Sequence, residues 1–264
     1  MRSDTEPIAT LKNIAAEYLC MTVRYDDFSV EWLGYATARL EPEGGPVAYT
    51  DPGRYGVLDD YWARDGDIVV VTHDHHYDPD GIRSVAREDA TLVIYDAVDS
   101  AGIDRDVESI DSLADDYDVI RVDDEARVDV ATPAGEVAVW SVAAYNDPEG
   151  PNAGPDGSVI HPPGFGCGFL LGLGDRTVFW PGDSDAFDGF AELDVSIFLA
   201  NIGGGGLVSD RHAAAELAEA MDPDLVVPIH YDTFEQLEAD GEAFAGDVAA
   251  RSIPVALDAR SANQ

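Results

Sequence analysis

The sequence predicts an α/β layered domain, and three observations carry that prediction. Uninterrupted apolar runs at 68–71 and 225–229 are typical of strands buried on both faces. Other segments space their apolar residues as helices do. The strands fall into two groups, which helices separate and flank. This pattern fits a layered domain but does not distinguish a doubly wound single sheet from a four-layer sandwich.

The first half of the chain predicts a helix followed by a strand-rich region. Residues 1–25 carry apolar side chains at helical spacing, which predicts a helical extension packed on a domain that spans 26–264: Leu11, Ile14, Ala15, Tyr18 and Leu19. Alternating apolar and polar residues predict two or three strands between 28 and 50, with a hairpin turn at E-P-E-G-G-P. Beyond them we expect a helix at 80–87, a loosely helical acidic stretch at 99–118, and strands at 91–95, 119–122, 127–130 and 136–142.

The second half begins with a long loop. Residues 146–166 are rich in Pro and Gly, and ordered loops of that length in compact domains are usually functional. We then expect strands at 168–173, 177–180 and 195–200, and a helix at 210–221 with Ser209 as its N-cap. A buried strand ends at His230, and the last helix is expected at 234–250.

The stretch V-V-V-T-H-D-H-H-Y-D-P, residues 69–79, carries three of the six histidines. They follow a buried strand, and the ends of such strands are where open α/β layers bind ligands. In an extended chain His73 and His75 point the same way and His76 the opposite way, so the first two can reach one metal ion. The neighbouring acidic residues are weaker evidence for a metal site, because 53 of the 264 residues are acidic.

T-H-D-H followed by Y-D resembles the H-x-H-x-D-H motif of the metallo-β-lactamase superfamily, and in particular of its lactonase-like branch of metal-dependent hydrolases. Six further segments resemble that branch in the same order: V-E-W-L-G-Y-A-T at 30–37, Y-T-D-P at 49–52, A-Y-N at 144–146, H-P-P-G-F-G-C-G-F at 161–169, F-W-P-G-D-S-D at 179–185 and V-V-P-I-H-Y-D-T-F at 226–234. The resemblance implies a four-layer αββα sandwich with the site along one edge of the two sheets.

The resemblance also implies a set of metal ligands. His73 and His75 match the first two histidines of the family. His161 matches the third and His230 the last, and Asp183 matches the bridging carboxylate. Each of the last three also has an ordinary role: a surface histidine, a histidine capping a strand-to-helix turn, and an Asx-turn residue. Three imidazoles with a carboxylate suit Zn, and also Mn or Fe.

The motif departs from the family pattern after its second histidine. Aligned without a gap, Tyr77 replaces the aspartate and Asp78 replaces the second-site histidine. If His76 is an insertion, Asp78 takes the aspartate's place and Pro79 replaces the histidine. Either way a second-site imidazole is missing, and His76 fills the gap only if its side chain turns back from the direction that parity gives it. We therefore expect one ion rather than two.

Several residues fall outside this ligand set. Tyr35 stands where the branch often has a histidine. His212 is expected to be a surface residue at a helix terminus. Cys20 and Cys167 are interpreted as two buried thiols rather than a disulfide, because the N-terminus carries no secretory signal.

These residues predict a metal-dependent hydrolase. A bound water, its pKa brought towards about 7 by the metal, would attack a carbonyl or phosphoryl centre. Asp78 would act as the catalytic residue that orients or deprotonates this water, and His230 would complete the site or bind the oxyanion. The substrate would be an ester, lactone or phosphoester of a small molecule. The alternative, motivated by the departure at 77–79, is a degenerate member of the fold that binds a metal or ligand without catalysis.

The charge balance indicates an unusual environment. The chain has 15 basic and 53 acidic residues and a net charge of −38, and Lys12 is its one lysine. An acidic surface with almost no lysine is typical of a halophilic protein, because molar salt shortens the Debye length to roughly 3 Å. The acids are spread along the chain, which argues against a surface for a basic partner, and no Lys/Arg cluster indicates a nucleic-acid groove. Without an apolar run long enough to cross a membrane, the sequence predicts a soluble, cytoplasmic protein.

Overall fold

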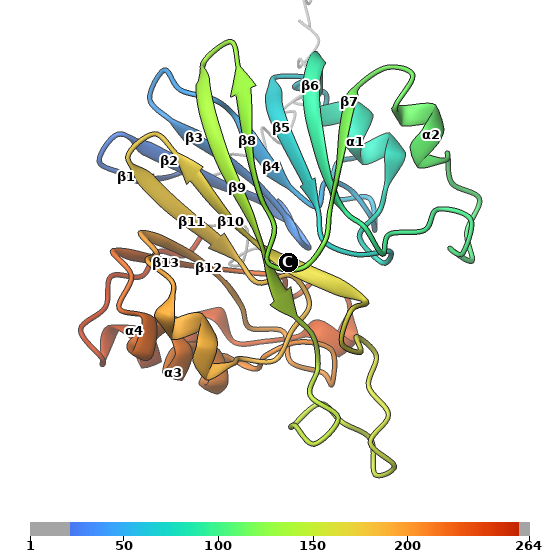
Figure 1. The fold of residues 1–264 in the computed structure, drawn as a ribbon. Coiled ribbons are helices and arrows are strands. Elements are labelled where there is room, and N and C mark those ends of the chain that lie inside the picture. Colours follow the sequence, from blue (N-terminus) through green and yellow to red (C-terminus); the bar gives the residue numbers. More distant parts are fainter. Residues whose placement is uncertain (1–21, 259–264) are drawn as a thin grey trace, which may run out of the picture.

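A computed structural model of the protein describes residues 22–258. Two β-sheets pack face to face, and helices lie outside each of them (Figure 1). Helices α1 and α2 lie beside the first sheet, whereas α3 and α4 cover the second. The fold is therefore a four-layer αββα sandwich, which confirms the predicted fold class.

The first sheet has seven strands in the order β1-β2-β3-β4-β5-β6-β7. The strands from β1 to β4 pair antiparallel, and those from β4 to β7 pair parallel. Their bounds are Val23–Tyr25 (β1), Phe28–Gly34 (β2), Thr37–Pro42 (β3), Ala48–Thr50 (β4), Gly66–Val71 (β5), Ala86–Tyr95 (β6) and Asp118–Val122 (β7).

The second sheet has six strands in the order β13-β12-β11-β10-β9-β8. The strands β11, β12 and β13 run parallel, and the other neighbours pair antiparallel. Their bounds are Arg127–Thr132 (β8), Gly135–Ala144 (β9), Gly166–Leu173 (β10), Arg176–Trp180 (β11), Ile197–Asn201 (β12) and Leu225–Ile229 (β13). As predicted, β5 and β13 are buried at every residue, and no helix or strand lies between β9 and β10.

The helices are short. The α-helices are Pro79–Val85 (α1), Ile110–Leu113 (α2), Arg211–Met221 (α3) and Gly241–Ala249 (α4), and the 3₁₀ helices are Asp188–Glu192 (η1) and Glu235–Leu237 (η2). Helix α3 contacts β12, η1 and α4, and α1 contacts β6. The described part of the chain contains no helix long and apolar enough to cross a membrane.

Both sheets direct their parallel strands to one edge of the sandwich. In the first sheet β4 leads into Asp51 and β5 into the histidine stretch. In the second sheet β11 leads towards Asp183 and β13 directly into His230. Because parallel strands end on the same side of a sheet, four segments distant in sequence meet at this edge.

Some predicted elements differ from the structure. Residues 1–21, including most of the predicted N-terminal extension and Cys20, lie outside the described residues. Val23–Tyr25, expected at the end of that extension, form β1, which pairs with β2. The N-cap of α3 is Asp210, whose carboxylate accepts from two backbone N–H groups, and not Ser209. Most of the stretch 99–118 is irregular, with α2 its one helix. The helix expected at 234–250 is divided into η2 and α4, because residues 238–240 leave helical geometry.

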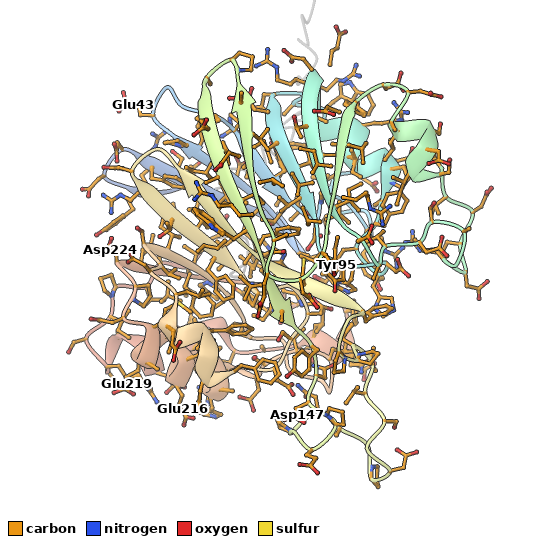
Figure 2. All side chains as sticks on the ribbon, in the orientation of Figure 1. Glu43, Tyr95, Asp147, Glu216, Glu219 and Asp224 are labelled. Atoms are coloured by element: carbon orange, nitrogen blue, oxygen red, sulfur yellow. The ribbon has the colours of Figure 1, made fainter. Side chains whose placement is uncertain are left out.

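The acidic residues lie mainly on the outside. Figure 2 labels Glu43, Glu216, Glu219 and Asp224 at the periphery of the molecule, and all four are exposed. Most of the acidic side chains of the described residues are thus exposed to solvent.

Candidate metal centre

The histidine stretch is a turn and not an extension of β5. The backbone N–H of His76 donates to the carbonyl of His73 at 3.1 Å, and that of Tyr77 to the carbonyl of Asp74 at 3.3 Å. The turn brings His76 back to the side of His73, so the direction predicted from strand parity was wrong for this residue. Strand parity applies only while the chain stays extended.

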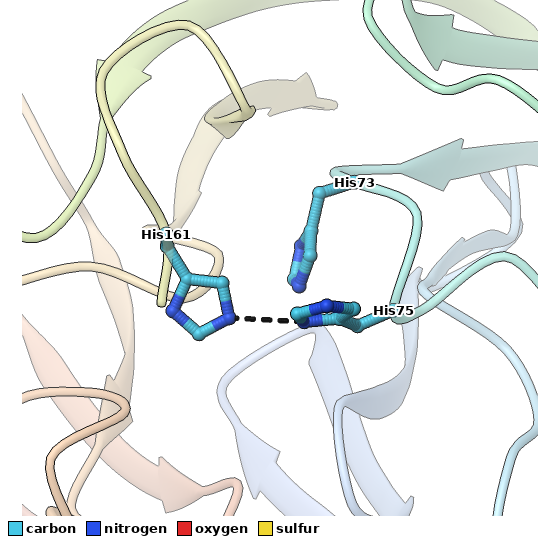
Figure 3. Close-up of side chains that lie close together, drawn as sticks. All are labelled: His73, His75 and His161. Carbon is cyan, nitrogen blue, oxygen red and sulfur yellow. Dashed lines mark hydrogen bonds between the residues drawn. The ribbon is translucent and has the colours of Figure 1, made fainter. Parts of the chain in front are cut away.

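Three of the predicted ligands meet on one side of Asp183. The ligand atoms of His73, His75 and His161 lie within 4.8 Å of one another (Figure 3). The His75 Nδ1 atom is 3.2 Å from the Nε2 atom of His161. The Oδ2 atom of Asp183 is 3.4 Å from Nε2 of His161 and 3.7 Å from Nε2 of His73. We call these three histidines the open cluster, because His75 is exposed to solvent.

Two other histidines meet on the opposite side of the same carboxylate. The Oδ1 atom of Asp183 is 3.2 Å from Nε2 of His230 and 3.4 Å from Nε2 of His76. The two Nε2 atoms are 3.3 Å apart. We call His76 and His230 the sealed cluster, because both side chains are at most 1% exposed. Asp183 therefore has one set of imidazoles at each oxygen.

The donor atoms fit metal ions. Two ligands of one tetrahedral ion, each about 2.1 Å from it, lie about 3.4 Å apart, close to the spacing seen within both clusters. Nε2 of His73 and Oδ1 of Asp183 are buried and have no hydrogen-bond partner among the described residues. Buried polar atoms without a partner are costly, so each of these two atoms favours a cation beside it, the first in the open cluster and the second in the sealed cluster.

Hydrogen bonds hold His161 in the ligand tautomer. Its Nδ1–H donates to the Asn146 side-chain oxygen and to the Leu207 carbonyl, each at 3.1 Å. The Asn146 amide is oriented in turn, because its NH₂ group donates to Asp185 and to the same Leu207 carbonyl. With the proton on Nδ1, Nε2 of His161 presents a lone pair to Asp183 and to any ion beside it.

Asp51 does the same for His76. Its carboxylate accepts from the Thr72 backbone and hydroxyl, from the Trp180 indole, and from Nδ1 of His76 at 2.9 Å. Although burial opposes it, the charges of Asp183 and Asp51 raise the pKa of His76. Asp51 lies within Y-T-D-P, one of the segments that resemble the family, but the sequence predicted no role for it. The sequence also left the role of His76 open. The available signal was an aspartate at the end of a strand next to the histidine-bearing strand.

The other four histidines of the two clusters have pKa values below the ordinary value. Burial, together with the charges of neighbouring histidines, lowers the pKa of His161 to about 3 and that of His75 to about 4. The same causes hold the pKa values of His73 and His230 well below the ordinary value. Burial raises the pKa of Asp183 to about 7. Neutral imidazoles are the form that binds metal ions.

Asp78, the predicted catalytic residue, lies outside both clusters. It is the N-cap of α1: one carboxylate oxygen accepts from the Gly81 backbone at 3.1 Å and the other from the Arg54 backbone at 2.7 Å. Two backbone donors occupy the carboxylate, and this geometry supports a capping role rather than that of a general base.

Tyr35 and His212 are not among the candidate ligands. Tyr35 packs its ring 4.5 Å from that of His230 and 4.9 Å from that of His76, so it covers the sealed cluster. Burial, followed by the charge of Asp183, raises its pKa well above the ordinary value. His212 is exposed on α3, as predicted.

Comparisons with known proteins identify the family and agree with the fold. Residues 29–230 match the model of the β-lactamase superfamily domain. A UPF0173 metal-dependent hydrolase of Salinibacter ruber is 26% identical over 81% of this chain and 88% of its own length, and one from Pyrococcus furiosus is 27% identical over 81% and 89%. The structure of a metallo hydrolase from Ignicoccus hospitalis superposes with a TM-score of 0.61 at 18% identity, over 86% of this chain and 93% of the other. The chain therefore belongs to the metallo-β-lactamase superfamily.

Proposed function

We propose that the protein is a metal-dependent hydrolase whose centre holds two ions with the carboxylate of Asp183 between them. The observation that carries this proposal is the division of the ligands, with each oxygen of Asp183 facing a separate set of imidazoles at 3.2–3.7 Å. His73, His75 and His161 would hold one ion, and His76 and His230 the other. The metals supply Lewis-acid activation of water and of the scissile carbonyl or phosphoryl group.

The residues of the chain position and protect this chemistry. The exposed His75 marks the side from which a small-molecule ester, lactone or phosphoester enters. Tyr35 and Trp180 exclude water from the sealed cluster, since both are almost completely buried beside it. Because its pKa is raised, Tyr35 keeps its phenolic proton at neutral pH and can donate a hydrogen bond to an anionic oxygen.

The proposed pair of ions replaces the single ion expected from the sequence. That expectation depended on a missing second-site imidazole, and His76 supplies one. Nitrogen donors with a single carboxylate favour Zn, with Mn or Fe as the other candidates. The departure at 77–79 motivated the non-catalytic alternative, and the imidazole of His76 weakens that alternative. Tyr77 itself is buried and donates its hydroxyl to the Glu108 carbonyl, so its position serves packing.

The test is a combined metal and turnover measurement. The protein is loaded with Zn in about 1 M KCl, its metal content is measured by plasma mass spectrometry, and a panel of para-nitrophenyl esters, lactones and bis-para-nitrophenyl phosphate is assayed. We expect two ions per chain and turnover that chelation abolishes. One ion per chain would restore the single-ion arrangement. Two bound ions without turnover of any member of the panel would favour the non-catalytic alternative.

We also propose that the protein works in concentrated salt, in the cytoplasm of a halophile. A net charge of −38 must be screened to keep the compact state, and the Debye length lengthens to about 10 Å at 0.1 M salt. The melting temperature followed by circular dichroism should fall steeply as KCl is lowered from molar to about 0.1 M. An unchanged melting temperature would contradict this proposal.

A further inference from the structure

The open cluster faces solvent beside an arginine that lacks a carboxylate partner. Among the described residues most arginines form ion pairs with the abundant acids: Arg39, Arg83, Arg87, Arg121, Arg127, Arg176, Arg211 and Arg251. Arg54 forms none with any described residue, although acids far outnumber bases in this chain. Arg24, Arg64 and Arg105 form no ion pair with the described residues either, so Arg54 is distinguished by its hydrogen bond to the carbonyl of the exposed His75.

The contacts of Arg54 leave one end of its guanidinium free. Its Nε–H donates to the carbonyl of His75 at 2.9 Å, and its Cζ atom lies 4.8 Å above the ring of Tyr55. No described residue hydrogen-bonds to its two terminal amino groups. The backbone of Arg54 is held at φ +65° by a hydrogen bond to Asp78, so the side chain starts from a fixed position. The free edge of the guanidinium is thus anchored next to the exposed metal-facing histidine.

Aromatic rings adjoin the same region. Phe165 lies 5.1 Å from the ring of His75, between ring centroids, and is only partly buried. Tyr55, which is 54% exposed, packs 5.0 Å from Phe234 and 4.9 Å from Tyr35. Tyr55 thus lies against the guanidinium of Arg54 and Phe165 against the ring of His75, so each of these two polar groups has an apolar ring beside it.

We propose that Arg54 is a specificity-determining residue that binds a carboxylate of the substrate, set apart from the scissile bond, while the apolar body of the substrate lies on Tyr55 and Phe165. This inference rests on the proposed function and names its substrate class: a small apolar or aromatic ester or lactone that carries a carboxylate. Two parallel N–H groups of a guanidinium match the two oxygens of a carboxylate. A singly charged group also meets less repulsion from the acidic protein than a phosphate dianion does.

The rival role for Arg54 is purely structural, as a clamp on the His75 carbonyl. Arg105 already fills such a role, since its guanidinium donates to the carbonyls of Tyr77 and Asp74 in the same turn. A cavity of about 600 Å³ also touches Arg54, but its other lining residues include Asp59, Asp60 and Asp80, which would repel an anion. We place the carboxylate on the His75 side, where the guanidinium of Arg54 meets the His75 carbonyl.

The first experiment measures binding without turnover. N-phenylglutaramic acid and its neutral counterpart valeranilide are titrated by saturation-transfer NMR into the wild type, Arg54→Gln, Arg54→Lys and Arg64→Gln, each before and after chelation, in about 1 M KCl. The charged anilide should bind wild type about tenfold or more tighter than the neutral one, and Arg54→Gln should lose that preference. Arg54→Lys should keep only part of that preference, because an ammonium group lacks the two parallel N–H groups of a guanidinium. Arg64→Gln removes an exposed guanidinium over Trp62 and should change nothing.

Chelation separates the guanidinium from the metals, because a carboxylate that binds the ions directly loses its advantage in the metal-free protein. Persistence of the preference there supports the proposal. Equal binding of the two anilides by wild type, with or without metal, overturns it, and this comparison needs no variant to fold. Metal content and melting temperature of Arg54→Gln close to wild type exclude the structural clamp as the cause of any loss.

The second experiment uses turnover of a matched pair, para-nitrophenyl hydrogen glutarate and para-nitrophenyl valerate. Arg54→Gln should lower kcat/KM for the charged ester about tenfold to a hundredfold, mainly through KM, and leave the neutral ester unchanged. An equal loss on both esters overturns the subsite. If neither ester is hydrolysed while the charged anilide still binds through Arg54, the proposed function fails and the carboxylate subsite stands.

Discussion

The open and sealed clusters differ in what surrounds them, although they share Asp183. In the open cluster His75 faces solvent, and the neighbouring Arg54 has no acidic partner. In the sealed cluster His76 and His230 are almost fully buried beneath Tyr35. We therefore propose different roles for the two clusters. The open cluster contacts the substrate, and the sealed cluster holds the carboxylate of Asp183 and stabilises one edge of the fold.

Buried hydrogen bonds hold the sealed cluster in place. Asp51 gathers four hydrogen bonds that tie His76 to Thr72 and Trp180, and thus connect the two sheets. The open cluster instead depends on the long loop, from which Asn146 orients His161. We expect substitutions in the sealed cluster to affect both stability and metal binding, and substitution of the exposed His75 in the open cluster to affect metal binding alone.

The largest effect is expected from Asp183→Asn, which removes the group common to both clusters. An amide oxygen is a weaker ligand than a carboxylate, so both ions should be lost and turnover should fall to background. The metal-free variant should unfold at the same temperature as the metal-free wild type or a higher one, because burial raises the pKa of Asp183 to about 7 and thus disfavours the charged form. Metal analysis and calorimetry check this. Asp188→Asn, at an exposed aspartate nearby, is the control, and retention of either ion would show that the clusters are independent.

The next effect contrasts His76→Ala with His75→Ala. Removing His76 leaves a cavity and deprives buried Asp51 of a donor, which should cost about 2–4 kcal/mol of unfolding free energy and the second ion. Removing the exposed His75 should cost less than about 1 kcal/mol, with loss of the first ion and of activity. Chemical denaturation of the metal-free proteins measures both. Equal destabilisation by the two changes would remove the distinction between the clusters.

Metal removal should proceed in two phases. A chelator reaches the open cluster directly, whereas the sealed cluster must first open, and each 1.4 kcal/mol of opening free energy slows release about tenfold. We expect at least such a separation in release rates, followed with a colorimetric zinc indicator. His75→Ala should eliminate the fast phase and His76→Ala the slow phase. A single phase in the wild type would indicate equal access to the two clusters.

The smallest effect is expected from Asp78, which belongs to neither cluster. Asp78→Ala should lower the unfolding free energy by about 1 kcal/mol through loss of the α1 cap, and Asp78→Asn, which retains a capping oxygen, should change it little. Rates on neutral esters should remain within about threefold of wild type for Asp78→Asn. A fall in rate by a factor of about 10² to 10⁴ with metal retained would restore the catalytic role predicted from the sequence.

The sequence alone determined the layered fold and five of the residues that converge. Runs such as 68–71 and 225–229 mark strands buried on both faces, and an ordered set of motifs that resembles the family picks out five residues: His73, His75, His161, Asp183 and His230. These features are local in sequence, because side-chain periodicity and strand-end residues are set by the segment itself. Their role as ligands stays a prediction until metal content is measured.

Only the tertiary structure decided the direction of His76, the partner of Asp51 and the isolation of Arg54. Periodicity describes the direction of a side chain only within a regular element, and the chain turns at His73, so His76 cannot be placed by counting residues. Asp51 and His76 lie 25 residues apart and meet because β4 and β5 are parallel neighbours. Whether an arginine lacks an acidic partner depends on the positions of all the acids around it in the folded protein. No single segment of the sequence determines those positions.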